Sequence, residues 1–194
     1  CIRDSGKLAP DERRAIGMRA APEERLGHAA APAMTLIENT LITSHSEDVI
    51  DQWGIIKFDN VKEKTRNIVS EFDVRTPTLD NAAASLSGGN LQKFVIGREI
   101  LQRPRVFVVN QPTWGVDAAA AAFIRQSIIN LASNGSAVVV ISQDLDELFE
   151  ICDTFSVLTN GRMSKSHDIR SLSSEDVGLL MGGSDLDLEN RDKA

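Results

Sequence analysis

The sequence predicts an α/β fold in which helices flank a mostly parallel sheet, with a small helical subdomain in the first half of the chain. Apolar runs of strand length, such as 138–141, show no alternation, as expected for strands that are covered on both faces of a parallel sheet. In the second half these runs alternate regularly with helical segments, which is the pattern of an α/β architecture. Residues 25–80 show helical spacing between polar loops, and they predict the helical subdomain.

The first half predicts a helix, a brief strand and two further helices, which cover residues 10–16, 17–22, 34–42 and 61–72. The first helix starts with Pro10 and carries acidic residues in its first turn. The strand stops at a proline. Thr35 or Thr40 is the expected cap of the second helix. Asn60 is the expected cap of the third helix, whose apolar residues share one face.

The second half predicts three helices and three strands in alternation, with a hairpin at its end. The expected helices are 90–102, 118–132 and 145–151, and the expected strands are 106–109, 137–142 and 155–159. Asn160-Gly161 is a hairpin turn that leads into residues 162–163. The acidic stretch after Ser184 has little apolar content and predicts a frayed tail.

Composition narrows the functional classes. With 194 residues, 42% of them hydrophobic, the chain can bury a core of one domain or of two small ones. Its formal net charge of −7 argues against a nucleic-acid partner bound through a broad basic surface. We find no apolar run long enough to span a bilayer and no secretory signal. Cys1 and Cys152 are too few for a disulfide framework or a zinc site, which favours a reducing cytoplasm.

The turn Ser87-Gly88-Gly89 has the chemistry of a phosphate contact. It opens a predicted helix, where unpaired backbone N–H groups and the positive end of the helix dipole point outward. Glycine lets a phosphate approach the backbone closely, and Ser87 adds a hydroxyl donor. An ordinary helix N-cap is the alternative interpretation of the same three residues.

These residues and their order along the chain resemble the ATPases of ABC transporters. Residues 86–93 are similar to the signature motif in its Leu-Ser-Gly-Gly-Asn form, which occurs in sugar and nucleoside importers. Residues 18–27 resemble the Q-loop region, and residues 106–117 resemble the Walker B strand with its D-loop. Residues 138–148 resemble the switch strand, and residues 155–163 resemble the hairpin that follows it. The resemblance covers about residues 10–182 and implies a partial RecA-like P-loop core. It also implies a division into 1–24, the start of a truncated core; 25–80, the helical subdomain; 81–183, the rest of the core; and 184–194, a tail.

Departures from the family pattern imply a degenerate catalytic site. The sequence contains no Gly-x-x-x-x-Gly-Lys-Ser/Thr loop to hold the β- and γ-phosphates. Asn110 and Gln111 stand where the family has Asp-Glu, so the positions lack the carboxylate that magnesium favours and the general base. Gln143 replaces the switch histidine, and Glu23 replaces the Q-loop glutamine. The fragment alone is therefore expected not to hydrolyse ATP and to bind no cofactor or metal, although its family hydrolyses ATP.

The resemblance further implies a shared nucleotide site. ABC ATPase domains dimerise head to tail, so the chain is expected to contact an ATP that the partner domain holds. The expected contacts are Ser87, Gly88, Gly89, Asn90 and Gln92. Asp117 is the corresponding residue of the D-loop. ATP and Mg²⁺ are then cofactors of the assembled transporter. The expected partners are a second ATPase domain, transmembrane permease subunits and, indirectly, a substrate-binding protein, with the chain on the cytoplasmic face of the cell membrane and no nucleic acid bound.

Several alternatives stay open at this point. A non-catalytic scaffold would have the same fold but no need of Ser87-Gly88-Gly89. A soluble ABC ATPase acting on nucleic acid or ribosomes is disfavoured by the acidic balance. Trp114 either packs against the partner domain or is an ordinary, partly buried residue. Arg25 either lies on a solvated face or helps to hold the Q-loop region. The chain does not start with methionine, and we expect it to be a C-terminal fragment of the ATP-binding protein.

Overall fold

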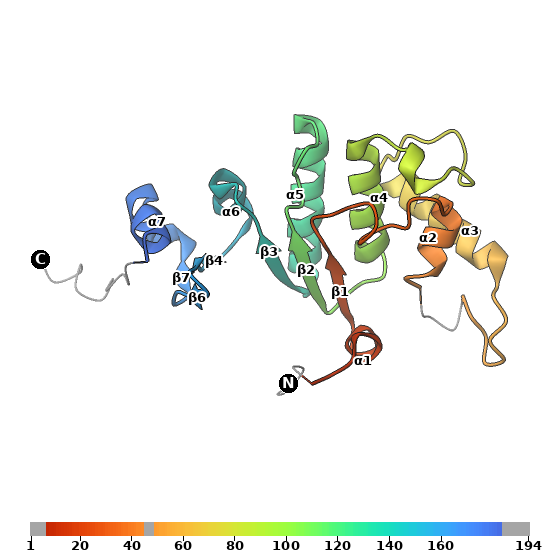
Figure 1. Cartoon of the computed structure of the whole chain (residues 1–194), viewed down its shortest axis with the longest axis horizontal. Helices are drawn as coiled ribbons and strands as arrows, with labels where there is room; N and C mark the ends of the chain where they lie inside the picture. The colour runs from red at the N-terminus through yellow and green to blue at the C-terminus, as the bar shows by residue number, and fades with distance from the viewer. Residues whose placement is uncertain (1–6, 45–48, 184–194) are drawn as a thin grey trace, which may run out of the picture. The chain divides into compact units, whose positions relative to one another are not determined.

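The computed structural model of the chain describes residues 7–44 and 49–183, and the chain divides into two compact units, 1–143 and 144–194. The first unit contains the three-stranded sheet and most of the helices (Figure 1). Its elements in chain order are α1 (Pro10–Ala15), β1 (Met18–Ala21), α2 (Leu36–Leu41), α3 (Phe58–Glu71), the 3₁₀ turn η1 (Ala83–Ser85), α4 (Gly88–Ile100), β2 (Val106–Asn110), α5 (Ala118–Ser133) and β3 (Ala137–Ile141).

The sheet of the first unit is fully parallel, with the strand order β1-β2-β3. Val106 of β2 pairs with Met18 on one side and with Ala137 on the other, which sets the register of all three strands. The parallel sheet with helices against it confirms the predicted fold class. Because the strands run in the same direction, their carboxyl ends meet at one edge of the sheet.

One face of this sheet is buried and the other is open. Phe107 and Val109 of β2 are fully buried on the face against which α4 and α5 pack side by side (Figure 1). On the opposite face Val139 is 50% exposed and Ile141 is 51% exposed. The expectation that the apolar strand 137–142 is covered on both faces is therefore wrong for β3. Its sequence is that of a strand with two covered faces, but the described helices of the first unit pack against only one of them.

The helical region follows β1 and contains α2 and α3. Thr35 caps α2 through a capping box with Glu38, as one of the two predicted alternatives requires. The prediction for α3 was wrong by three residues: the helix starts at Phe58 after Lys57, and Asn60 lies inside its first turn. The reason is tertiary, because the Lys57 N–H donates to the Val49 carbonyl at 2.8 Å and fixes the chain just before the helix.

The boundaries of the remaining elements of this unit agree with the prediction to within two residues. The helix that was expected to begin at Asn90 begins at Gly88, directly after Ser87. The strand β2 extends one residue further than predicted and ends at Asn110, and α5 starts after Asp117. The glycine turn and the strand end that carry the functional argument are thus where the sequence placed them.

The second unit is small and was only partly predicted. The helix 145–151 is confirmed, and Asn160-Gly161 forms the expected hairpin turn with both φ angles positive. The single expected strand 155–159 is instead two strands that pair with different partners, and the last helix was missed. The elements are α6 (Leu145–Ile151), β4 (Thr154–Phe155), β5 (Leu158–Thr159), β6 (Arg162–Met163), β7 (His167–Asp168), the 3₁₀ turn η2 (Ile169–Ser171) and α7 (Ser174–Met181). The expected tail after Ser184 lies outside the described residues.

Candidate functional site

The start of α4 presents a glycine turn to solvent. Ser87 is the N-cap residue, with an extended backbone at φ −63° and ψ 154°, but its side chain makes no capping hydrogen bond. Instead the Ser87 hydroxyl accepts from Asn90 Nδ2 at 2.9 Å. Ser87 and Gly88 are exposed, and Gly89 is half-buried. Because the first N–H groups of a helix have no partner within it, this turn offers donors to an outside acceptor.

Two further predicted contact residues are turned toward the protein. The Asn90 Oδ1 accepts from the Arg75 N–H at 2.9 Å, which ties the turn to the segment that follows α3. Gln92 is buried, with 2% exposed. Its Nε2 donates to the Pro112 carbonyl at 2.7 Å, and its Oε1 accepts from Arg25 Nε at the same distance. Both residues support the turn, and Gln92 has no free surface with which to reach a nucleotide.

The predicted positions at the strand ends are brought to one edge of the sheet. Glu23 follows β1 by two residues and is exposed, Asn110 ends β2 and is half-buried, and Gln143 follows β3 by two residues and is exposed. The parallel order β1-β2-β3 places these three segments in sequence along the edge. Only Glu23 of the three carries a charge.

Gln111 has an unusual backbone at this edge. Its φ is +51°, in the left-handed region that non-glycine residues seldom adopt, and its side chain is buried. The Gln111 N–H donates to the Ile141 carbonyl at 2.8 Å, which extends the pairing of β2 with β3 by one residue. The Gln111 carbonyl accepts from the Trp114 N–H at 3.2 Å, which starts the turn toward α5. At the end of that turn, Asp117 caps α5 by accepting from the Ala120 N–H at 2.9 Å.

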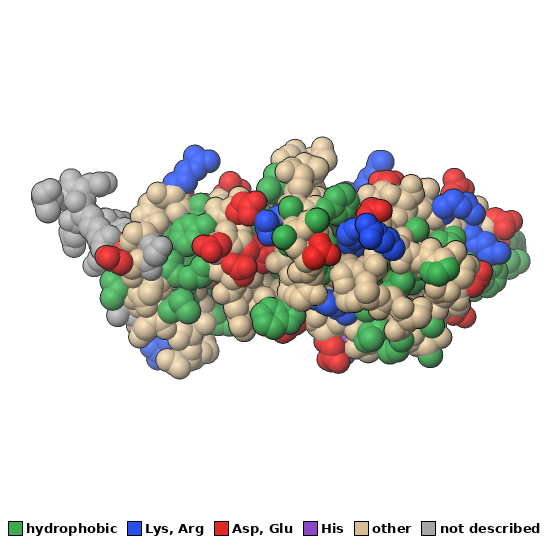
Figure 2. Space-filling model, turned by 90° about the horizontal axis from the view of Figure 1, so that it is seen from above, with side chains coloured by type: hydrophobic (Ala, Val, Ile, Leu, Met, Phe, Trp, Pro, Cys, Tyr) green, Lys and Arg blue, Asp and Glu red, His purple; other side chains and the backbone are tan. Residues whose placement is uncertain are grey.

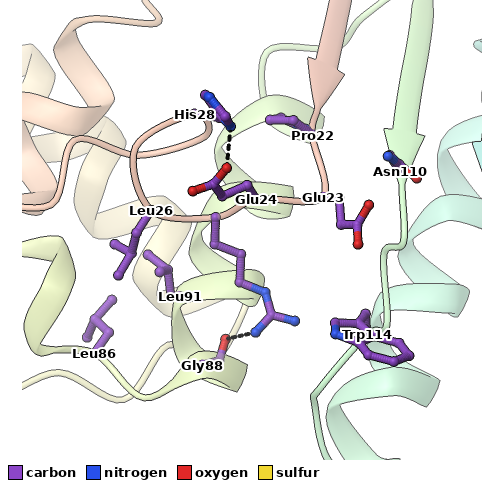
Figure 3. Close-up of a pocket in the computed structure, with 11 residues that line it drawn as sticks. Pro22, Glu23, Glu24, Leu26, His28, Leu86, Gly88, Leu91, Asn110 and Trp114 are labelled. Atoms are coloured by element: carbon purple, nitrogen blue, oxygen red, sulfur yellow. Dashed lines mark hydrogen bonds and ion pairs between the residues drawn. The ribbon is translucent and has the colours of Figure 1, made fainter.

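A pocket of about 840 Å³ separates the glycine turn from the strand ends (Figure 3). Gly88 lines one side, Asn110 and Trp114 line the opposite side, and the Glu23 carboxylate points between them. The Arg25 guanidinium lies in the same pocket and donates from Nη1 to the Gly88 carbonyl at 3.5 Å. Burial lowers the pKa of Arg25 from its ordinary value. The sequence left two roles open for Arg25. In the structure its side chain connects the loop after β1 to the glycine turn.

The chain has relatives among curated proteins that it matches over most of its own length. It is 33% identical over 177 residues to the guanosine import ATP-binding protein NupO of Bacillus subtilis, which covers 91% of this chain and 35% of NupO. It is 32% identical over 165 residues to the nucleoside import ATP-binding protein NupA of Lactococcus lactis, covering 85% of this chain and 33% of NupA. The galactose/methyl galactoside import ATP-binding protein MglA of Mannheimia succiniciproducens is 31% identical over 161 residues, 83% of this chain and 32% of MglA. The chain therefore spans about a third of the length of these relatives.

Solved structures show the same fold. The dimeric post-hydrolysis ATP-binding cassette MJ0796, bound to ADP and Pi, superposes with a TM-score of 0.67 at 18% identity, over 86% of this chain and 70% of that one. A putative metal-chelate type ABC transporter in an inward-facing conformation matches with a TM-score of 0.66 at 19% identity, over 86% and 64%. The chain is homologous to ABC import ATP-binding proteins. No family model matches the chain.

In this fold the glycine turn and the strand ends lie on two sides of one pocket. The turn fits the phosphates of ATP, whereas the strand ends do not fit Mg²⁺. The turn at Ser87-Gly88 has exposed helix N-terminal donors, which suit a phosphate. Asn110 and Gln111 contribute amides, and a hard divalent cation favours carboxylate oxygens, so this strand end does not fit magnesium. Among residues 7–44 and 49–183, no group of three or more His, Cys, Asp or Glu side chains is placed to hold a metal ion.

The surface of the chain has mixed charge. On the face shown in Figure 2, Lys and Arg side chains are scattered among Asp and Glu side chains, without a continuous basic surface. None of the helices in the described ranges combines the length and the apolar content that crossing a bilayer requires. Trp114 is 65% exposed at the rim of the pocket, so it is available for an outside contact.

Proposed function

We propose that the chain is a C-terminal ATP-binding-domain fragment of an ABC importer for simple sugars or nucleosides. In this proposal it supplies the turn Ser87-Gly88-Gly89 to an ATP that a partner ATPase domain holds, while its own catalytic site is degenerate. The observation that carries the proposal is the contrast between the two sides of the pocket. The turn keeps its exposed donors, whereas the strand ends carry amides at Asn110 and Gln111.

The exposed turn supports a contact in trans. The helix that follows Ser87 is thirteen residues long, so its N-terminus carries a full dipole end. The backbone N–H groups of Gly88 and Gly89 are positioned to donate to phosphate oxygens. The Ser87 hydroxyl can add a third donor, because it only accepts from Asn90 and its own O–H is not used in that bond. A bound ATP would supply the phosphoryl group, and the residues of this chain would bind and orient it.

The strand ends support an inactive site. Gln111 cannot accept a proton at neutral pH, so it cannot act as a general base toward water. Asn110 can accept a hydrogen bond but brings no negative charge to offset a divalent cation. Gln143 can donate to a phosphate but does not titrate near neutral pH as histidine does. We therefore assign hydrolysis in the assembled importer to the partner domain, with ATP and Mg²⁺ as the cofactors of that site.

The open sheet face supports the fragment assignment. β3 is an edge strand of the described sheet, and its residues Val139 and Ile141 are about half exposed. Large apolar side chains on a strand with this sequence are expected to be covered. The chain aligns with 70% of the ABC domain MJ0796 and with about a third of NupO, which leaves further chain in the relatives to supply a cover.

The proposed partners follow from the same assignment. They are a second ATPase domain in a head-to-tail dimer and transmembrane permease subunits, with a substrate-binding protein acting indirectly. The chain would then lie at the cytoplasmic face of the cell membrane, held there by its permease. The pocket beside Glu23, at the edge of the helical region, is the surface through which closure would be transmitted to the permease. A non-catalytic scaffold is the second candidate function, and Asn110 and Gln111 are the observation in its favour.

The two candidates differ in what the glycine turn does. The test places Ser87→Arg in the complete importer and measures ATP hydrolysis and transport. We expect a loss of about 100-fold, because the long cation fills the space of a phosphate and removes the hydroxyl donor. Ser85→Arg is the matched control: it adds the same side chain two residues earlier, at another exposed serine, and should leave both rates unchanged. Gln111→Ala should also change the rates little.

The outcomes separate the proposals clearly. Wild-type transport by Ser87→Arg would show that the turn does not contact nucleotide and would favour the scaffold. A separate measurement on the isolated chain with MgATP should show no hydrolysis above background. Turnover at ordinary ABC ATPase rates in that measurement would overturn the degenerate-site argument.

A further inference from the structure

Arg25 and Gln92 form one continuous hydrogen-bonded connection that starts at the pocket, which Arg25 lines. Arg25 Nε donates to Gln92 Oε1 at 2.7 Å, and Gln92 Nε2 donates to the Pro112 carbonyl at 2.7 Å. Both distances lie at the short end of the range for N–H···O hydrogen bonds and indicate well-formed bonds. The Gln92 carboxamide thus uses its acceptor on one neighbour and its donor on another. A primary carboxamide carries a donor and an acceptor on one planar group, which suits it to bridge two neighbours in this way.

The Arg25 guanidinium also lies between two glycines. A Cβ atom at Gly88 would come within 3.0 Å of Arg25 Nη1, and a Cβ atom at Gly115 would come within 3.5 Å of Nη2. Gly115 has a φ of +63°, which a larger residue would adopt only under strain. The lack of side chains at both positions leaves room for the planar guanidinium against the backbone.

These contacts join three separate segments of the first unit. Arg25 belongs to the loop after β1, two residues after Glu23. Gly88 and Gln92 lie in the first two turns of α4. Pro112 and Gly115 belong to the turn between β2 and α5. A displacement of the loop that carries Glu23 must therefore break the bond to Gln92 or move the start of α4 with it.

From this connection we propose that Arg25 and Gln92 are positioning residues that couple the loop of Glu23 to the nucleotide-facing turn Ser87-Gly88-Gly89. The inference rests on the proposed function, because it assumes that this turn contacts the ATP held by a partner. It adds a means of regulation: the turn is held ready for ATP only while the loop after β1 is in place. Arginine is required because its fork donates from Nε and from Nη1 at once, which a lysine cannot do.

The chain contains a second Arg–Gln pair that provides a matched control. Arg19, in β1, donates from Nε to Gln102 Oε1 at 2.9 Å, and Gln102 Nε2 donates to the Arg98 carbonyl at 3.0 Å. This pair also joins the β1 segment to α4, but at the opposite end of the helix. Burial lowers the pKa of Arg19 as it does that of Arg25. The two pairs have the same side-chain chemistry and both arginines are half-buried, but Gln102 is half-buried whereas Gln92 is buried. Of the four residues, only Arg25 lines the pocket.

The experiment compares the two pairs in the full-length ATP-binding protein, with and without its own permease reconstituted in liposomes. The variants are Arg25→Lys, Gln92→Met and their double variant, against Arg19→Lys and Gln102→Met. The readout is the ratio of the ATP hydrolysis rate with permease to the rate without it. A merely structural defect scales both rates together and leaves this ratio unchanged. Ser87→Arg is measured alongside as the reference for the proposed function.

We expect the ratio to fall about tenfold for Arg25→Lys and for Gln92→Met, the size of effect that contacting residues commonly produce. The double variant should lose no more than either single variant, since the connection is broken once. The ratio of the Arg19 and Gln102 variants should stay within twofold of wild type. If all four single variants keep the wild-type ratio while Ser87→Arg abolishes hydrolysis, the coupling is refuted and the proposed function stands. If Ser87→Arg has no effect on hydrolysis, the proposed function itself fails.

Discussion

The contact between Gly97 and Phe72 gives a stability prediction whose sign is not the one expected for a helix. Gly97 lies inside α4, where glycine ordinarily costs about 1 kcal/mol relative to alanine. However, a Cβ atom at Gly97 would lie 2.6 Å from two carbon atoms of the Phe72 ring. That is about 1 Å closer than the optimum for two carbon atoms. The ring must move before an alanine can be accommodated.

Phe72 has little freedom to move. It is 4% exposed, and its ring packs edge-to-face against Phe123 with centroids 5.5 Å apart. Overpacking a core by one methyl group costs about 1–3 kcal/mol. After subtraction of the helix-propensity gain, Gly97→Ala should lower the free energy of unfolding by up to about 2 kcal/mol. For a chain of this size the unfolding midpoint then falls by up to about 8 °C.

The assay is thermal and urea unfolding followed by circular dichroism at 222 nm. Gly89→Ala is the control in the same helix, because its Cβ atom would lie 4.0 Å from Val116, an ordinary contact. Phe72→Leu provides a second test: in that background Gly97→Ala should become stabilising, since the ring that opposes the methyl group is gone. A higher midpoint for Gly97→Ala in the wild-type background would refute the reasoning, and so would equal effects in both backgrounds.

The remaining predictions concern charged and titratable groups. Arg98→Ala should destabilise the chain by about 3–5 kcal/mol in urea unfolding, because the buried Glu99 carboxylate, 2.8 Å from Arg98 Nη2, loses its cation. Replacing both Arg98 and Glu99 by Met should cost much less, because no unpaired charge is left buried. Equal losses in the two variants would contradict this account. Burial, with smaller contributions from neighbouring carboxylates, raises the pKa of the Cys152 thiol, so its alkylation by iodoacetamide should reach half its maximal rate at a higher pH than in a free peptide; a peptide-like profile would be the contrary result. The hydrogen bond from Lys93 and its charge lower the pKa of Asp73, so this pair stabilises the fold above the ordinary pKa of aspartate and less as the pH falls through the lowered value. NMR titration should show that the pKa of Asp73 rises in the Lys93→Met variant. An unchanged pKa would show that Lys93 does not lower it.

Local signals predicted the elements that their own residues define. The apolar run of β2 specifies its own strand, and that strand was found where expected. The start of α5 also agrees with the prediction, although its cap, Asp117, was predicted only as a D-loop residue. The last helix, α7, also has a local signal that was overlooked, a capping box formed by Ser173 and Asp176. The start of α3 could not be located in this way, because the bond from Lys57 to Val49 that fixes it crosses a loop.

The residues of the candidate site also differ in whether local sequence or tertiary contacts determine their roles. The identity of the glycine turn and of the amides at the strand end follows from sequence alone. The burial of Gln92 does not, because its partner Arg25 lies 67 residues away in the chain. A glutamine just inside an exposed turn has the sequence signal of a ligand contact, and only the tertiary structure shows that both ends of its amide are occupied. Residues that support a site are therefore harder to predict than those that form its surface.

The failed expectation for β3 is informative about the protein. A five-residue strand with Val139 and Ile141 on one face and Val138 and Val140 on the other is the pattern of a strand covered on both sides. Within the described part of the first unit, helices cover only one of those sides. Sequence patterns report the environment in which a strand functions, and exposed apolar side chains on an edge strand invite pairing with other chains. The half-exposed apolar side chains of β3 therefore agree with the proposed origin of the chain in a longer ATP-binding protein, which would supply a cover for this face.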